Sequence, residues 1–165
     1  MSALRKENDD VDAKLVNPFI DAFISVMPQI GFPIPKRTKV YLQNKNITNF
    51  GVAVMLGFTK QIRGNVVYNM NEDTAKFIAS TMMMGMPVSE IDTMAQSAIA
   101  EMSNMLAANT ATNLTALDLE VDISTPSVTV GKDTQMKISN TQYLTIEMDL
   151  GGHKVDIAIA VDRDV

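Results

Sequence analysis

The chain has 165 residues, a formal net charge of −5 and no cysteine. This length predicts one domain with a full hydrophobic core. The negative charge argues against a nucleic-acid partner. The lack of cysteine excludes a disulfide framework and thiolate chemistry. Because no apolar run reaches the roughly 18 to 20 residues that span a bilayer and the first residues are charged rather than signal-like, we expect a cytoplasmic protein.

The amino-terminal part of the chain predicts a tail followed by a helix. Residues 1–10 are polar with mixed charges and predict a disordered tail, which we expect can be deleted without loss of the fold. The single domain is then expected over residues 11–165. Its first helix ends near Met27 to Ile30, and it either starts at Pro18 with Asn17 as its cap or has a lead-in that is kinked at the proline.

The middle of the chain predicts three strands and two helices. The strands are expected at 38–43, 51–58 and 65–70, and the second of them is almost continuously apolar, which indicates a central strand. Asn71 is the expected cap of a helix that stops at Gly85. Ser89 and Asp92 form a capping-box pattern that opens a long helix ending near Leu117.

The carboxyl-terminal part predicts a hairpin. Residues 142–150 and 153–161 alternate between apolar and polar around Gly151 and Gly152, which is typical of two strands joined by a tight turn. This register places three apolar pairs on one face: Met148 with Val155, Ile146 with Ile157, and Leu144 with Ile159. The fold class is therefore α+β, an antiparallel β-sheet with long helices packed on one face.

The long helix has two distinct sides. At about 100° per residue, one side carries an apolar stripe that is expected to enter the core: Ile91, Ala95, Ile99, Met102 and Leu106. The opposite stripe carries Ser97, Glu101 and Asn104, which would face outward. Glu and Asn at this spacing also occur on ordinary solubilising helix faces. Without a nucleophile beside them, the outward pair suggests a helix that completes the active site of another protein.

Other polar features leave alternatives open or predict surface residues. Asn109 and Asn113 lie on the apolar side of the long helix, so either the helix passes the edge of the sheet there or these amides bond to backbone. His153, the only histidine, is expected to be exposed at a hairpin tip, and one histidine does not build the usual zinc site. The 13 methionines indicate adaptable core filling, with a methionine-rich binding face as the alternative.

Four stretches of the chain together resemble a known family. They are residues 16–22, residues 85–92, the run Ser97-Ala-Ile-Ala-Glu101-Met-Ser-Asn104-Met, and residues 121–131 with Ser124-Thr-Pro126. This combination resembles the CheX branch of the CheC/CheX/FliY family, phosphatases of phosphorylated CheY-type response regulators. The family signature has an Asp or Ser, then a Glu, then an Asn on one helix, followed by a Pro some twenty residues later. This signature is matched here by Ser97, Glu101, Asn104 and Pro126.

The resemblance implies a fold, an activity and partners. It implies a CheC/CheX-like fold and a hydrolase that removes the phosphoryl group from a receiver domain, in chemotaxis or two-component signalling. Asn104 would position the attacking water, and Glu101 would pair with the receiver's active-site Lys. Ser97 would contribute a contact at the rim, and Pro126 would shape a strand end. No cofactor would be bound by this chain, because Mg²⁺ belongs to the partner receiver.

Two departures and one alternative accompany this resemblance. Residues 17–27 lack the second Glu/Asn pair that some members have, so one site per chain is expected. Ala108 stands where CheX relatives often have Gly, and its methyl could crowd a receiver loop. A homodimer is expected, paired through the sheet with the carboxyl-terminal strands supplying the edge. The alternative function is a non-catalytic adaptor that binds a receiver or a flagellar switch component.

Overall fold

The structure is a computed structural model that describes residues 13–163, so the predicted tail, residues 1–10, lies outside the described part. The elements in chain order are α2 (Ala13–Gln29), β1 (Lys36–Thr48), β2 (Gly51–Lys60), β3 (Ile62–Asn71), α3 (Glu72–Met82), α4 (Thr93–Thr115), β4 (Val121–Ile123), β5 (Ser127–Val130), β6 (Gln135–Leu150) and β7 (His153–Arg163). Within these residues, no helix is both long and apolar enough to cross a membrane.

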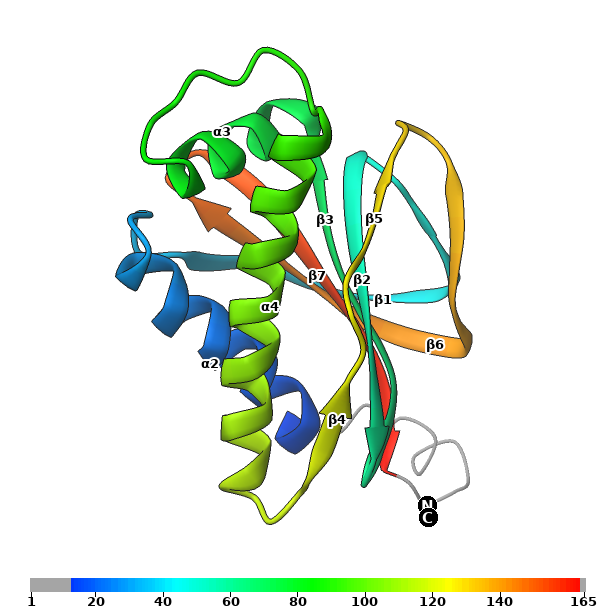
Figure 1. Ribbon diagram of the computed structural model, residues 1–165. Coiled ribbons are helices and arrows are strands. Elements are labelled where there is room, and N and C mark those ends of the chain that lie inside the picture. The colour runs from blue at the N-terminus through cyan, green and yellow to red at the C-terminus, as the bar shows by residue number, and fades with distance from the viewer. Residues whose placement is uncertain (1–12, 164–165) are drawn as a thin grey trace.

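The strands form one seven-stranded sheet, and the three helices cover one of its faces (Figure 1). The strand order is β1-β6-β7-β3-β2-β4, with β5 also paired to β2, and every pair is antiparallel. This confirms the predicted α+β class. The expected length holds for α2 and α4, with 17 and 23 residues, whereas α3 has only 11.

The carboxyl-terminal hairpin has the predicted register. Met148 pairs with Val155, Ile146 with Ile157, and Leu144 with Ile159. The expectation that these strands supply a free edge of the sheet for dimer pairing is wrong, however. Strand β7 lies between β6 and β3, and β6 lies between β1 and β7. Local alternation reports which face of a strand is buried, but not which strands lie on either side of it. The long free edge of the sheet belongs to β1.

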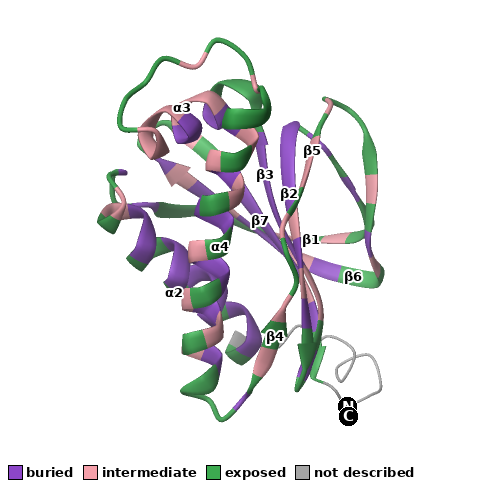
Figure 2. Ribbon diagram, in the orientation of Figure 1, coloured by how far each residue is buried: buried purple, intermediate pink, exposed green. Residues whose placement is uncertain are grey.

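Strand β2 lies inside the sheet but not at its centre. It is paired with β3 on one side and with the short strands β4 and β5 on the other. Both of its faces are buried because the far halves of β1 and β6 cross the sheet face opposite the helices. Ile47, Ile138 and Tyr143 from those halves pack there on Ala53 of β2. Figure 2 shows the resulting run of buried residues along β2.

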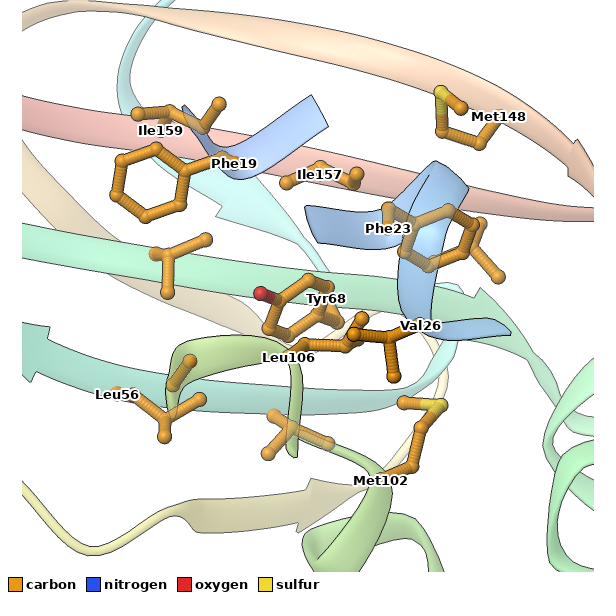
Figure 3. Packing of buried hydrophobic residues seen from close by; sticks show 14 of the residues in the cluster. Phe19, Phe23, Val26, Leu56, Tyr68, Met102, Leu106, Met148, Ile157 and Ile159 are labelled. Carbon is orange, nitrogen blue, oxygen red and sulfur yellow. The ribbon is translucent and has the colours of Figure 1, made fainter. Parts of the chain in front are cut away.

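The main core lies between the helices and the sheet. Figure 3 shows side chains from α2, α4 and the sheet meeting around Tyr68 of β3. Phe19 of α2 contacts Phe58 of β2 edge to face, with 5.3 Å between the ring centroids. The Tyr68 hydroxyl has no hydrogen-bond partner among residues 13–163, and burial raises its pKa, so it stays protonated.

Tyr68→Phe is expected to stabilise the fold. A buried hydroxyl without a partner costs about 1 to 3 kcal/mol of desolvation, and phenylalanine fills the same space without that group. We expect a higher free energy of unfolding in urea, with an unchanged dependence on denaturant. Tyr143→Phe is the contrasting variant, because the Tyr143 hydroxyl donates to the Asn46 carbonyl at 2.7 Å and its loss should destabilise. A clear loss of stability in Tyr68→Phe would contradict the prediction.

The helix ends follow the predictions at two places and differ at a third. Helix α2 runs through Pro18, which corresponds to the lead-in alternative. Asn71 caps α3 as expected, and its side chain accepts from the Thr74 amide. The predicted capping box at Ser89 is wrong, because α4 begins at Thr93 and Asp92 is its cap. A side chain that accepts from the third helical amide satisfies one of the open donors by itself, so Ser89 is not needed.

Most methionines serve as core filling. Of those described, Met27, Met70, Met102 and Met148 are buried, and five others are half-buried. Among the described methionines, only Met84, Met86 and Met94 are exposed, and all three lie between the end of α3 and the first turn of α4.

Candidate functional site

Helix α4 is held on the sheet by the predicted apolar stripe. Ala95, Ile99, Met102 and Leu106 are fully buried, and Ile91 packs at the edge of the core. The Asp92 carboxylate accepts from the Ala95 amide at 2.8 Å and closes the amino-terminal end of the helix. These contacts leave the helix little freedom to rotate, so the direction of its outward side chains is fixed.

The polar groups on the buried side of α4 are satisfied within the chain. The hydroxyls of Ser103 and Thr110 donate to the carbonyls of Ala100 and Leu106 in the preceding turn. The Asn113 amide donates to the Pro18 carbonyl of α2 at 3.0 Å and lies 3.4 Å from Asn109 Oδ1. Of the two alternatives for these asparagines, backbone bonding is therefore correct for Asn113. This bond also ties α4 to α2.

Ser97, Glu101 and Asn104 lie together on the exposed side of α4, where the helical pattern predicts them. Figure 2 shows this exposed stripe running along the helix on the side away from the sheet. Glu101 and Asn104 are one turn apart, and no hydrogen bond or ion pair within the described residues occupies either side chain. A carboxylate and a carboxamide are thus free to contact another molecule.

The exposed side of α4 is unusually poor in charge for a helix at a surface. Its exposed residues are Thr93, Met94, Ser97, Glu101, Asn104, Ala108, Thr112 and Thr115. Glu101 is the only charged residue in the whole helix. A solvated helix face normally carries several charges, whereas small uncharged residues allow a second surface to approach closely. This signal was present in the sequence and strengthens the case for a contact surface around one carboxylate.

Ala108 lies on this surface, and Pro126 lies on the segment that connects β4 and β5. Ala108 is exposed one turn beyond Asn104. Pro126 is half-buried between β4 and β5, and α4 contacts both strands, so this segment runs beside the middle of the helix (Figure 1). A proline has no amide to donate, which interrupts pairing with β2, and Ser124 bridges the break by accepting from the Gly57 amide at 2.7 Å.

Apart from Tyr68 in the main core, the perturbed ionisable groups of the described residues lie on the other face of the sheet. Tyr41 donates its hydroxyl to Asp156, and burial raises the pKa of that carboxyl. The pKa of Glu147 is lowered because its carboxylate accepts from Thr38 at 2.7 Å. These bonds fasten the edge strand β1 to β6 and β7, which is a structural role.

His153 differs from its expected position. It is half-buried and stacks on Phe77 of α3 with 4.2 Å between the ring centroids, so it packs the hairpin against the helix. The described residues also contain no cluster of three or more His, Cys, Asp or Glu side chains that could hold a metal ion.

Solved structures define the class of this fold. A CheC-like protein from Shewanella superimposes with a TM-score of 0.79 at 22% identity, over 92% of this chain and 99% of that one. A CheX from Desulfovibrio desulfuricans gives 0.80 at 18% identity, over 90% and 99%. A Borrelia burgdorferi complex of CheX, CheY, BeF3 and Mg²⁺ gives 0.73 at 23% identity, over 93% and 99%. The protein has the CheC/CheX-like fold.

Sequence comparison gives the family. The family model described as chemotaxis phosphatase CheX matches residues 52–149. The CheY-P phosphatase CheX of Thermotoga maritima is 32% identical over 127 residues, which are 77% of this chain and 82% of that protein. The chain belongs to the chemotaxis phosphatase CheX family.

Proposed function

We propose that this protein is a phosphatase that hydrolyses the aspartyl phosphate of a CheY-type response regulator. Its Thermotoga relative is named a CheY-P phosphatase, and its Borrelia relative was crystallised with CheY. The observation that carries the proposal is the Glu101–Asn104 pair on the charge-poor outward side of α4. This side chain pair enters the receiver's active site instead of forming a complete site within this chain.

Asn104 is the residue that acts on the water. Its amide both donates and accepts hydrogen bonds without carrying a charge, so it can hold a water in line with the acyl phosphate. A carboxylate in the same place would be repelled by the phosphoryl oxygens. The water oxygen forms a new bond to phosphorus as the bond from phosphorus to the aspartyl oxygen breaks. Inorganic phosphate and the free receiver carboxylate are the products.

Glu101 sets the register of the complex. Its carboxylate forms a charge-assisted pair with the receiver's active-site Lys, which places Asn104 one turn away over the phosphate. Ser97, one turn earlier, contributes a minor hydrogen bond at the rim. Ala108 bounds the contact at the other end, where its methyl limits how closely a receiver loop approaches. Pro126 acts through the shape of the segment beside α4.

The metal requirement follows from this division of roles. The charge of the phosphoryl group is balanced by Mg²⁺ and Lys in the receiver, so this chain needs no cofactor of its own. The Borrelia complex of CheX and CheY contains Mg²⁺. Removal of Mg²⁺ by a chelator should therefore abolish assisted dephosphorylation without altering the thermal unfolding of this protein alone.

A phosphate-release assay tests the proposal. Purified receivers from the same genome are phosphorylated, and the decay of each is compared with and without this protein. Acceleration of at least one receiver supports the phosphatase. The alternative is a non-catalytic adaptor that binds a receiver or a flagellar switch component through the same helix. Binding to a receiver loaded with beryllium fluoride, a stable mimic of the phosphoryl group, without any acceleration would favour that alternative.

The protein is further proposed to be a homodimer, now paired through β1. This strand is the long free edge of the sheet, and it exposes Val40 and Leu42. We expect light scattering at micromolar concentration to give twice the chain mass of 18.1 kDa. Leu42→Lys should shift the mass toward one chain, because it places a charge in the shared edge. A wild-type mass near one chain would contradict the prediction.

A further inference from the structure

The first turn of α4 exposes an apolar side chain at a position where helices favour acids. Asp92 caps the helix, Thr93 and Met94 follow, and the first turn contains no acidic residue. Met94 has 62% of its surface exposed. An acidic side chain there would be hydrated and would interact favourably with the positive end of the helix dipole. Met94 therefore contributes less to the stability of the helix than an acid would.

Helix α3 has the favoured arrangement at the same positions. Asn71 caps it, and the acids Glu72 and Asp73 are its first two helical residues. Asp73 of α3 thus corresponds to Met94 of α4, since each is the second residue after the cap. Single apolar residues occur on every protein surface, so exposure alone does not distinguish Met94. The contrast between the two helix starts indicates that Met94 serves a contact outside the chain.

Met94 lies on the same side of α4 as Glu101. The two residues are seven positions apart, so they lie about 10 Å apart along the helix axis and about 20° apart around it. Ser97 lies between them and is small, uncharged and exposed. The other exposed methionines, Met84 and Met86, belong to the connection that arches over α3 and not to α4 (Figure 1). A partner that covers Glu101 and Ser97 reaches Met94 without meeting another charge of the helix.

We infer that Met94 is an apolar anchor that raises the affinity of this protein for its phosphorylated receiver. The inference rests on the proposed function, in which Glu101 and Asn104 reach the phosphorylation site. Met94 contacts receiver side chains about two helical turns from Glu101, so it contributes binding and does not touch the reacting atoms. Methionine suits this role because its unbranched, polarizable side chain adapts to the shape of the opposing surface. Burial of its apolar surface on docking favours the complex.

Two variants of Met94 and one control test this role. Met94→Gln keeps the length and the helix propensity of the side chain but removes the apolar contact. We expect KM for the phosphorylated receiver and the dissociation constant for the beryllium fluoride-loaded receiver to rise roughly tenfold, with an unchanged kcat. Met94→Leu should keep values near the wild type, because it replaces one apolar side chain by another of similar volume. Leu117→Gln, a comparable change just beyond the other end of α4, should also keep them.

A third variant separates docking from stability. Met94→Asp places at this position the side chain that Asp73 provides in α3, so the thermal midpoint of unfolding should stay the same or rise. KM should nevertheless rise at least as much as in Met94→Gln, because the apolar anchor is lost. A structural role would instead lower the thermal midpoint in both polar variants, and that result would overturn the inference.

The remaining outcomes separate this inference from the proposed function. A wild-type KM in Met94→Gln, or an equal rise in Leu117→Gln, would overturn the inference while the phosphatase stands. So would a lower mass of Met94→Gln in light scattering, since Met94 would then face a second copy of the chain. If the wild type accelerates no receiver, the proposed function fails. Met94 is then judged by the dissociation constant for the beryllium fluoride-loaded receiver, which should still rise roughly tenfold in Met94→Gln. A wild type that does not bind this receiver would overturn the inference as well.

Discussion

Asn104→Ala should lower assisted dephosphorylation by roughly 10²- to 10³-fold, so that the receiver decays almost at its own rate. This is the typical effect of removing one hydrogen-bonding group that acts in the transition state. The side chain is exposed and makes no contact that the fold needs, so stability should change by about 0.5 kcal/mol or less. Phosphate release and the dissociation constant for the beryllium fluoride-loaded receiver, measured side by side, separate lost chemistry from lost binding.

Two further variants sharpen the test of Asn104. Asn104→Asp keeps the shape but replaces the amide by an anion, so it should be as inactive as the alanine variant. Asn140→Ala removes an exposed asparagine from β6, away from α4, and should leave the rate unchanged. If Asn104→Ala dephosphorylates its cognate receiver at the wild-type rate, the proposed mechanism is wrong.

Glu101→Ala should act on association as well as on rate. Truncating one partner of an ion pair that becomes buried in a complex leaves the other charge without a partner, and we expect KM to rise on the order of tenfold to a hundredfold. Wild-type binding should weaken as salt rises, because the pair is screened at its rim, and the variant should lose most of that dependence. Binding isotherms at several salt concentrations measure this.

The control for Glu101 is another exposed glutamate. Glu120 follows the end of α4, and its hydrogen bonds within the described residues are made by its backbone: the amide donates to the Gln61 side chain and the carbonyl accepts from the Gln61 amide. Glu120→Ala makes the same change in net charge, so it corrects for any general electrostatic effect. Equal loss of binding in Glu120→Ala and Glu101→Ala would show that net charge, and not a specific pair, governs association.

Short-range patterns predicted a large part of this fold. The alternation around Gly151 and Gly152 gave every apolar pair of the hairpin, because a two-residue turn sets the register and the strand period sets the face. The apolar stripe of α4 separated the buried Met102 from the exposed Glu101 and Asn104, because helical geometry is the same in every context. The roles of Glu101 and Asn104 come from the family resemblance and remain proposals.

The errors share one cause, which is the lack of information on spatial neighbours. The capping box at Ser89 was wrong because Ser89 and Asp92, three positions apart, are both capping residues, and the packing of Ile91 and Ala95 decides where the helix enters the core. His153 was expected at an exposed tip because the sequence does not show that Phe77 lies over it. The extended halves of β1 and β6 were missed because their partners are about 90 residues apart in the chain.

The sequence by itself determined the helices, the faces of α4 and of the carboxyl-terminal hairpin, and the outward Glu101–Asn104 pair, since these depend on periodicities of two and 3.6 residues. The tertiary structure alone decided that β1 is the free edge and that Asn113 bonds to α2. Each of these depends on strand order or on contacts between distant segments. Such contacts form only when the whole core packs, because burial of apolar surface is not directional and leaves several local arrangements open.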